Sequence, residues 1–441
     1  GDLTIAHNVT TTGGAGSGAI ALTSAGMVNL DPTGASDITL LTTNANDLVF
    51  MAAMSIFIDQ ETATDLGVAN INLNGGNVAV DPGAGNTLGL GDDAVGGAVS
   101  DFEIDDAAMQ ALIDATTAPV VFGTAAADRI LLDTATDFGA RSFGVITGST
   151  IDDVDGGSDA LQTTGTLLLT STGAVGSGGD PFALNVANLG LTTGAADITN
   201  SSALTVIDST VTGALGLATT SGNLAINAIA ATGLTVTLNA AGAITDANGA
   251  TSNIDATTLD ATAASGIDLD TTIDMLTAAG GAGAIDISDV DALTVTSATT
   301  TDGAITIAAG NTLTATLLDA QDLAADELHD VTLTTAAGNI VVDSITADNE
   351  VILNAAGAVT DANAGATNIT ALSLDATATS GIDLDTDVDS ITAAGGAGTI
   401  DLNETDTVTL ANVATTDGAI TVTSGNTMTV TAVDAQDAGA D

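Results

Sequence analysis

Aspartates at alternating positions of short apolar segments are the residues of this sequence best suited to chemistry. They form three groups, which are Asp268, Asp270 and Asp274; Asp383, Asp385, Asp387 and Asp389; and Asp152, Asp153 and Asp155. The second group follows the first at a distance of 115 residues. Carboxylates at such spacing suit Ca²⁺, a hard cation that takes about six to eight oxygen ligands. The sequence therefore predicts calcium binding at these residues, with a solvated acidic face as the alternative.

Residues for acid–base or nucleophilic catalysis are scarce. The two histidines are His7 and His329, and neither lies beside a recognisable nucleophile, so both are interpreted as surface or turn residues. A β-helical polysaccharide lyase or glycoside hydrolase, which would use clustered aspartates, remains the enzymatic alternative. The prediction is that the chain is not an enzyme.

The charge balance excludes several classes of partner. The 441 residues include 56 Asp and Glu against 2 Lys and Arg, which gives a net charge of -54. Nucleic acids, heparin and anionic lipid surfaces all require a basic patch, and the only basic side chains besides histidine are Arg129 and Arg141. Without lysine there is no Schiff-base chemistry, and without cysteine there is no disulfide or thiolate metal site.

Hydropathy argues for a folded chain outside the membrane. The mean hydropathy is +0.42, which is too apolar for a typical disordered protein of high net charge. No apolar run approaches the roughly 18 residues of a membrane span. The first residues, GDLTIAHNVT, contain neither Met nor a basic stretch, so we expect a processed chain or a piece of a longer one.

An internal repeat organises the second half of the sequence. Residues 238–322 align without gaps to residues 353–437, and roughly three-fifths of the aligned positions are identical. We therefore expect a segment of divergent turns over residues 1–237, a first repeat unit over 238–352 and an incomplete second unit over 353–441.

A shorter period indicates β-strands. Segments such as GNLAI at 222–226, GAITI at 303–307 and GNIVV at 338–342 each place a glycine before alternating apolar residues, and they recur about every 8 to 12 residues. Helical spacing occurs only at residues 105–114, where one short helix is predicted.

Two all-β architectures fit this period, a parallel β-solenoid and an array of β-sandwich domains. A sandwich core is usually filled by large side chains, yet aromatic residues make up only 2% of the chain and Trp is absent. The solenoid, whose turns suit small β-branched residues, is favoured. In its strands Ile267, Leu269 and Ile382 should point inward, and Asp268 and Asp270 outward.

Part of the sequence resembles filamentous-haemagglutinin-type surface proteins. The acidic stretch 100–112 (SDFEIDDAAMQAL), followed by PVVFGT at 119–124 and RILL at 129–132, is similar to an insert that recurs in that family, and the glycine-led segments 76–80 and 222–226 are similar to its turns. The resemblance implies a right-handed parallel β-helix, secretion, and an adhesive or structural role. The amino-terminal secretion domain typical of the family is not visible in this sequence.

These observations predict an acidic extracellular repeat protein that forms part of a cell-surface filament, stalk or matrix fibre, or alternatively of a surface layer. The expected partners are further copies stacked head to tail, and a carbohydrate or cell-surface receptor. Four Asn-x-Ser/Thr sequons, at Asn8, Asn200, Asn368 and Asn403, weakly support export.

Overall fold

The computed structural model contains two compact units, Gly1–Ser221 and Gly222–Asp441. It describes residues 120–127, 129–133, 137–153, 161–176, 180–321 and 329–436, and before residue 120 only the first ten strands and Met109. Both copies of the 115-residue repeat lie in the second unit.

The elements described in the first unit are short β-strands. They are β1 (Leu3–Ile5), β2 (Val9–Thr10), β3 (Ala19–Thr23), β4 (Met27–Leu30), β5 (Leu40–Leu41), β6 (Leu48–Ala52), β7 (Ser55–Ile58), β8 (Asn77–Asp81), β9 (Thr87–Gly91), β10 (Phe102–Ile104), β11 (Val120–Phe122), β12 (Arg129–Asp133), β13 (Phe143–Ile146), β14 (Thr150–Asp153), β15 (Leu161–Thr170), β16 (Phe182–Thr193), β17 (Ala196–Asn200), β18 (Leu204–Val206), β19 (Ser209–Val211) and β20 (Leu215–Thr219).

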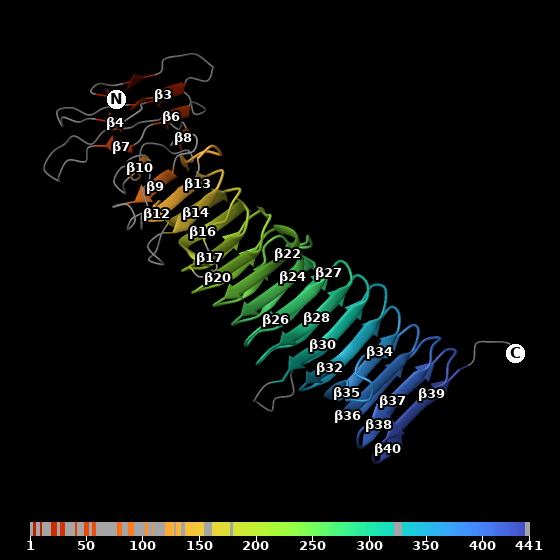
Figure 1. Ribbon diagram of the computed structural model, residues 1–441. Coiled ribbons are helices and arrows are strands. Elements are labelled where there is room, and N and C mark those ends of the chain that lie inside the picture. The colour runs from red at the N-terminus through yellow and green to blue at the C-terminus, as the bar shows by residue number, and fades with distance from the viewer. Residues whose placement is uncertain are drawn as a thin grey trace. The chain divides into compact units, whose positions relative to one another are not determined.

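The second unit continues this pattern with strands that stack in order. They are β21 (Leu224–Ile226), β22 (Ile229–Ala240), β23 (Ile244–Asp246), β24 (Ile254–Ala263), β25 (Ile267–Thr272), β26 (Met275–Ala279), β27 (Ile285–Asp289), β28 (Leu293–Thr299), β29 (Ile305–Ala309), β30 (Leu313–Ala320), β31 (Val331–Thr335), β32 (Ile340–Ala347), β33 (Glu350–Ala355), β34 (Val359–Asp361), β35 (Ile369–Ala378), β36 (Ile382–Ala394), β37 (Ile400–Glu404), β38 (Val408–Thr415), β39 (Ile420–Ser424), β40 (Met428–Val430) and β41 (Val433–Ala435). Figure 1 shows β26, β28, β30 and β32 side by side.

Strand pairing in both units is that of a parallel solenoid. Each strand pairs with one from the next turn, as β25 does with β27 and β27 with β29, and these ladders are parallel. The prediction of a right-handed parallel β-solenoid is confirmed. The sandwich alternative is wrong, because a sandwich is built from antiparallel strands joined by hairpins.

Alternation along each strand separates the core from the surface. Ile267, Leu269 and Ile382 are buried and Asp268 is exposed, as predicted, while Asp270 is half-buried. Successive turns stack like residues on one another, so Ile267 lies against Ile285 in the next turn. The interior is made of Ile, Leu, Val and Ala, which pack closely without aromatic residues in the second unit.

The 115-residue repeat advances the chain by about five and a half turns. Each of the five turns after Ile267 places one residue in the same ladder of paired strands. These residues are Ile285, Ile305, Val331, Val351 and Leu374. Ile382, the repeat equivalent of Ile267, belongs to another ladder, where it pairs with Val359 and Ile400. Equivalent residues of the two copies are therefore half a turn apart around the solenoid.

The helix predicted over residues 105–114 lies outside the described residues, except for Met109, whose side chain is fully buried.

Candidate functional site

Carboxylates on successive turns form an acidic column on the outside of the second unit. Asp268 on β25 pairs with Asp286 on β27, and both side chains point outward. Burial raises the pKa of Asp268, and repulsion from Asp286, Asp246 and Asp270 raises it further. Burial and then Asp270 raise the pKa of Asp286 as well. The ionised form of these carboxyl groups is therefore disfavoured by burial and by repulsion between neighbouring carboxylates.

The second copy repeats this column. Asp383 on β36 pairs with Asp401 on β37. Burial raises the pKa of Asp383, followed by repulsion from Asp401, Asp361 and Asp385. The carboxylate of Asp385, two residues further along β36, accepts a hydrogen bond of 2.8 Å from Asn403 Nδ2.

A buried asparagine fixes the backbone beneath each column. The Nδ2 group of Asn253 donates to the carbonyl oxygen of Ile226 at 2.9 Å and to Asp246 Oδ1 at 2.8 Å, while its Oδ1 accepts from the Asp270 N–H at 2.7 Å. These bonds join three successive turns through one side chain. Because amides inside a protein must be hydrogen-bonded, this arrangement specifies the corner of the turn.

Asn368 makes the same bonds in the second copy. Its Nδ2 group donates to the carbonyl oxygen of Val342 at 3.0 Å and to Asp361 Oδ1 at 2.9 Å, and its Oδ1 accepts from the Asp385 N–H at 2.8 Å. Burial would raise the pKa of Asp361, but the hydrogen bond from Asn368 and those from three backbone N–H groups lower this pKa below the ordinary value.

A second pair of acidic residues points into the solenoid instead of outward. Asp289 Oδ2 accepts hydrogen bonds from Thr271 Oγ1 at 2.8 Å and from the Ile273 N–H at 2.9 Å. Its repeat equivalent Glu404 accepts from Thr386 Oγ1 at 2.7 Å and from the Val388 N–H at 3.2 Å. Burial raises the pKa of both carboxyls, against these hydrogen bonds, which lower it.

Glu404 also belongs to the one group of three carboxylates that converge within the described part of the chain. Oxygens of Asp387, Glu404 and Asp406 lie within 4.8 Å of one another. The first copy has Thr272 in place of Asp387, so the triad is not repeated. Glu404 is buried and already accepts hydrogen bonds, which leaves the exposed Asp387 and Asp406 as the more accessible ligands.

Sequence reasoning identified Asp387 but missed Glu404 and Asp406. The length of the turn would have identified them, because it determines which residue of the next strand lies beside Asp387. Thr386, the neighbour of Asp387, pairs with Glu404. The other predicted ligands Asp274 and Asp389 are exposed on their turns and strands, outside any such group among the described residues.

In the first unit the predicted acidic turn is partly neutralised. Asp152 Oδ2 lies 2.7 Å from Arg129 Nε and accepts a hydrogen bond of 2.8 Å from Thr150 Oγ1. Asp153 Oδ2 accepts a weak hydrogen bond of 3.4 Å from the Ala183 N–H. Asp155 lies outside the described residues.

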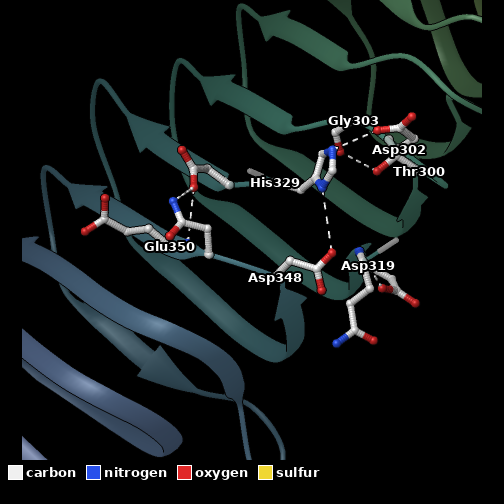
Figure 2. A network of polar contacts seen from close by, with 10 residues as sticks. Thr300, Asp302, Gly303, Asp319, His329, Asp348 and Glu350 are labelled. Carbon is white, nitrogen blue, oxygen red and sulfur yellow. Dashed lines mark hydrogen bonds and ion pairs between the residues drawn. The ribbon is translucent and has the colours of Figure 1, made fainter. Parts of the chain in front are cut away.

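His329 lies between β30 and β31, outside the strands, but it is buried, so the interpretation of it as a surface residue is wrong. Its side chain is 8% exposed, and its Nε2 lies 3.0 Å from Asp302 Oδ1 while its Nδ1 lies 3.7 Å from Asp348 Oδ2 (Figure 2). Asp302 precedes β29 and Asp348 follows β32, so the imidazole lies between acids of different turns. No sequence pattern near His329 points to these partners, which lie 27 residues before and 19 after the histidine. His7 lies outside the described residues.

The sequons differ sharply in accessibility. Asn200 and Asn368 are buried and hydrogen-bonded through their amides, so neither can be glycosylated in the folded chain. Asn403 is exposed on β37, and Asn8 lies outside the described residues. The sequons are therefore weaker support for export than their number indicates.

Comparison with known proteins adds no family to this description. The chain matches no protein-family model, and no curated protein or solved structure matches it. Within the described part of the chain, no helix has the length and apolar character needed to cross a membrane.

Proposed function

We propose that this chain is a structural repeat protein, a segment of an extracellular filament, stalk or matrix fibre. The observation that carries the proposal is the duplicated acidic column of the second unit, which recurs with the same supporting asparagine in both copies. Repetition of one surface suits a role in which the same contact is made many times along a molecule. A single catalytic centre would not need a second copy.

The proposed role is adhesive as well as structural, with a carbohydrate or cell-surface receptor as the partner. Outward-facing Asp, Asn and Thr side chains on paired strands support it, because they supply hydrogen-bond acceptors and donors at the regular spacing of the turns. Binding of the purified chain to an array of carbohydrates tests this role. Absence of binding at any ionic strength would leave only the structural part of the proposal.

Calcium is the proposed counter-ion of the acidic surface. Residues 222–441 contain no lysine or arginine, so mobile cations must neutralise their carboxylates. A divalent ion would bind best at the exposed Asp387 and Asp406 beside Glu404, because three carboxylates converge there.

The proposal also holds that the chain is not an enzyme and that copies associate end to end. Negative-stain images of the native material test the fibre directly, and filaments are the expected result. Incubation with polysaccharides, followed by assay of reducing and unsaturated ends, tests catalysis. Steady release of reducing or unsaturated polysaccharide ends would overturn the prediction that the chain is not an enzyme and would favour a lyase or a glycoside hydrolase.

A further inference from the structure

Two loops at equivalent places of the repeat each hold one asparagine against the preceding turn. Asn248 lies between β23 and β24, and Asn363 lies between β34 and β35. The Nδ2 group of Asn248 donates to the carbonyl oxygen of Asn227, and that of Asn363 donates to the carbonyl oxygen of Asp343. Each side-chain amide therefore links its loop to the turn before it.

The two asparagines have similar surroundings. Both Oδ1 atoms are buried, and neither has a hydrogen-bond donor among the described residues. In the first copy, Asp246 Oδ1 accepts from the N–H groups of Asn248 and Gly249, at 2.6 and 3.1 Å. The second copy repeats this arrangement around Asp361, where the N–H of Ala364 lies at 3.3 Å. The residue after the asparagine is thus glycine in one copy and alanine in the other.

This difference bears on the chemistry of the amide. An asparagine loses its amide when the next backbone nitrogen attacks the side-chain carbon Cγ and closes a five-membered succinimide ring. A side chain on the next residue hinders this approach, and glycine has none. Asn248-Gly249 is the one Asn-Gly pair in the part of the chain that the structure describes.

We propose that Asn248 is a site of spontaneous deamidation in the folded chain, and that its equivalent Asn363 is not. The Gly249 nitrogen passes its proton to the Asp246 carboxylate, which already accepts its hydrogen bond, and forms a bond to Asn248 Cγ. The bond from Cγ to Nδ2 then breaks, and Nδ2 takes up that proton and leaves as ammonia. Water opens the succinimide to aspartate or isoaspartate, so water is the only co-reactant.

The first loop has room for this ring closure. Gly249 is exposed, and so are Ala247 and Ala250 on either side of the pair. Apart from its neighbours in the chain, no atom lies within 4 Å of the position that a Cβ on Gly249 would take. The Gly249 peptide can therefore turn towards Asn248 Cγ without meeting another turn of the solenoid.

Deamidation removes the link between the two turns. The product has no N–H to donate to the carbonyl oxygen of Asn227, and it adds a negative charge two residues from Asp246. One of its oxygens takes the buried position at which no described donor lies, which is costly for a charged group. The folded chain therefore loses stability as it ages. This inference goes beyond the proposed structural role and does not depend on it.

Mass spectrometry measures the reaction at both asparagines. The folded chain is incubated at mildly alkaline pH and digested with pepsin, and the mass gain that marks replacement of an amide by an acid is followed with time. The rate at Asn248 should exceed that at Asn363 at least about tenfold, a barrier difference of about 1.4 kcal/mol. Gly249→Ala should protect Asn248, and Ala364→Gly should make Asn363 reactive. Equal rates at the two asparagines would overturn the inference.

The unfolded chain separates the effect of the fold from that of the dipeptide. In guanidinium chloride Asn248 should react at a rate within about tenfold of its rate in the folded chain. A folded chain in which Asn248 reacts more slowly than that would overturn the inference, because the loop would then block the ring closure. Neither result bears on the fibre role, which images of native material decide.

A substitution that imitates the product tests the loss of stability. Asn248→Asp should lower the denaturant midpoint, because the link to Asn227 is lost. Asn412→Asp is the matched control, since it adds the same charge at an exposed residue of β38. Equal midpoints for the two variants would overturn the proposed loss of stability.

Discussion

Asn368 Oδ1 accepts a hydrogen bond from the backbone N–H of Asp385 at 2.8 Å, and the backbone N–H of Asn368 donates to the Asp385 carbonyl oxygen at the same distance. One buried residue thus holds both polar backbone groups of its neighbour on the next turn. Its Nδ2 group reaches back to Val342 on the preceding turn. An apolar residue of the same size would keep the backbone bond but could make neither of the two side-chain bonds.

Asn368→Ala should therefore destabilise the second unit markedly. Each buried backbone group left without a partner costs about 1–3 kcal/mol, so a loss of roughly 3 kcal/mol or more is expected. Denaturant unfolding measures it. The control is Asn403→Ala, on an exposed residue whose two side-chain hydrogen bonds are both exposed, and it should cost less than about 1 kcal/mol. Equal losses for the two variants would contradict the role of the buried amide.

The orientation of β36 can be tested with neighbouring residues. Ile382 is buried and Asp383 is exposed. Ile382→Asp should destabilise the unit by several kcal/mol, because an unpaired carboxylate would enter an apolar core. Asp383→Ser should be neutral or slightly stabilising, since it removes repulsion from Asp401. Thermal melts of both variants provide the test, and similar behaviour would show that the strand faces the other way.

A backbone difference between the repeat copies predicts a stabilising substitution. Ala364 has a φ of 56°, a conformation that glycine adopts readily and alanine does not, and its equivalent Gly249 has a φ of 73°. Ala364→Gly should raise stability by up to about 1 kcal/mol, whereas Gly249→Ala should lower it by a similar amount or more. Denaturant midpoints should move in opposite directions. A shift of the same sign in both variants would contradict this account.

Stability should increase as the solution becomes mildly acidic. The pKa values of Asp268, Asp383 and Glu404 are raised by burial, and for the two aspartates by neighbouring carboxylates as well. A carboxyl group with a higher pKa in the folded chain binds its proton more readily there, so stability is gained as the pH falls from the folded pKa towards the unfolded value of about 4. Asp361, whose pKa is lowered, opposes this trend but is a single group.

Thermal melts at constant ionic strength should show a higher midpoint at about pH 5 than at pH 7. Replacing Asp268 and Asp383 by Asn should flatten this dependence. Asp260→Asn serves as the control, because Asp260 lies on an outer strand position between Thr237 and Thr277. A midpoint that rises from pH 5 to pH 7 would contradict the prediction.

Calcium should stabilise the chain beyond the effect of ionic strength. Millimolar Ca²⁺ is expected to raise the melting midpoint relative to a chelator at equal ionic strength, because an ion that binds only the folded state adds to its stability. Asp387→Asn should reduce this increment, since it removes one of three converging carboxylates. Asp274→Asn is the matched control on an exposed aspartate outside that group. An unchanged midpoint with Ca²⁺ would remove the ion from the proposal.

The sequence was sufficient to predict the class of fold and the facing of its strands. Alternation in GIDLD at 266–270 has a period of two, which places Ile267 and Leu269 on one side and Asp268 on the other. Local patterns of this kind predict the structure well because every turn of the solenoid buries one face of its strands and exposes the other.

Contacts between turns could not be predicted in the same way. The partners of His329 lie in the preceding and following turns, and the number of residues per turn varies with each corner. From Ile285 to Ile305 the ladder advances 20 residues, but from Ile305 to Val331 it advances 26. A sequence period averaged over the chain therefore cannot say which acid meets the histidine, nor that Glu404 lies opposite Thr386.

The half-turn offset between repeat copies sets the directions in which the two acidic columns face. If each copy advanced the chain by whole turns, Asp268 and Asp383 would project in one direction, and ions or receptors that bound them could bridge molecules only in pairs. With equivalent columns half a turn apart, consecutive copies project their columns in different directions, and a molecule can engage neighbours on two flanks at once. Particles of this kind form extended networks where one-sided particles form pairs. If the columns bind ions or receptors as proposed, the odd half turn would let one molecule join an extended network instead of a pair.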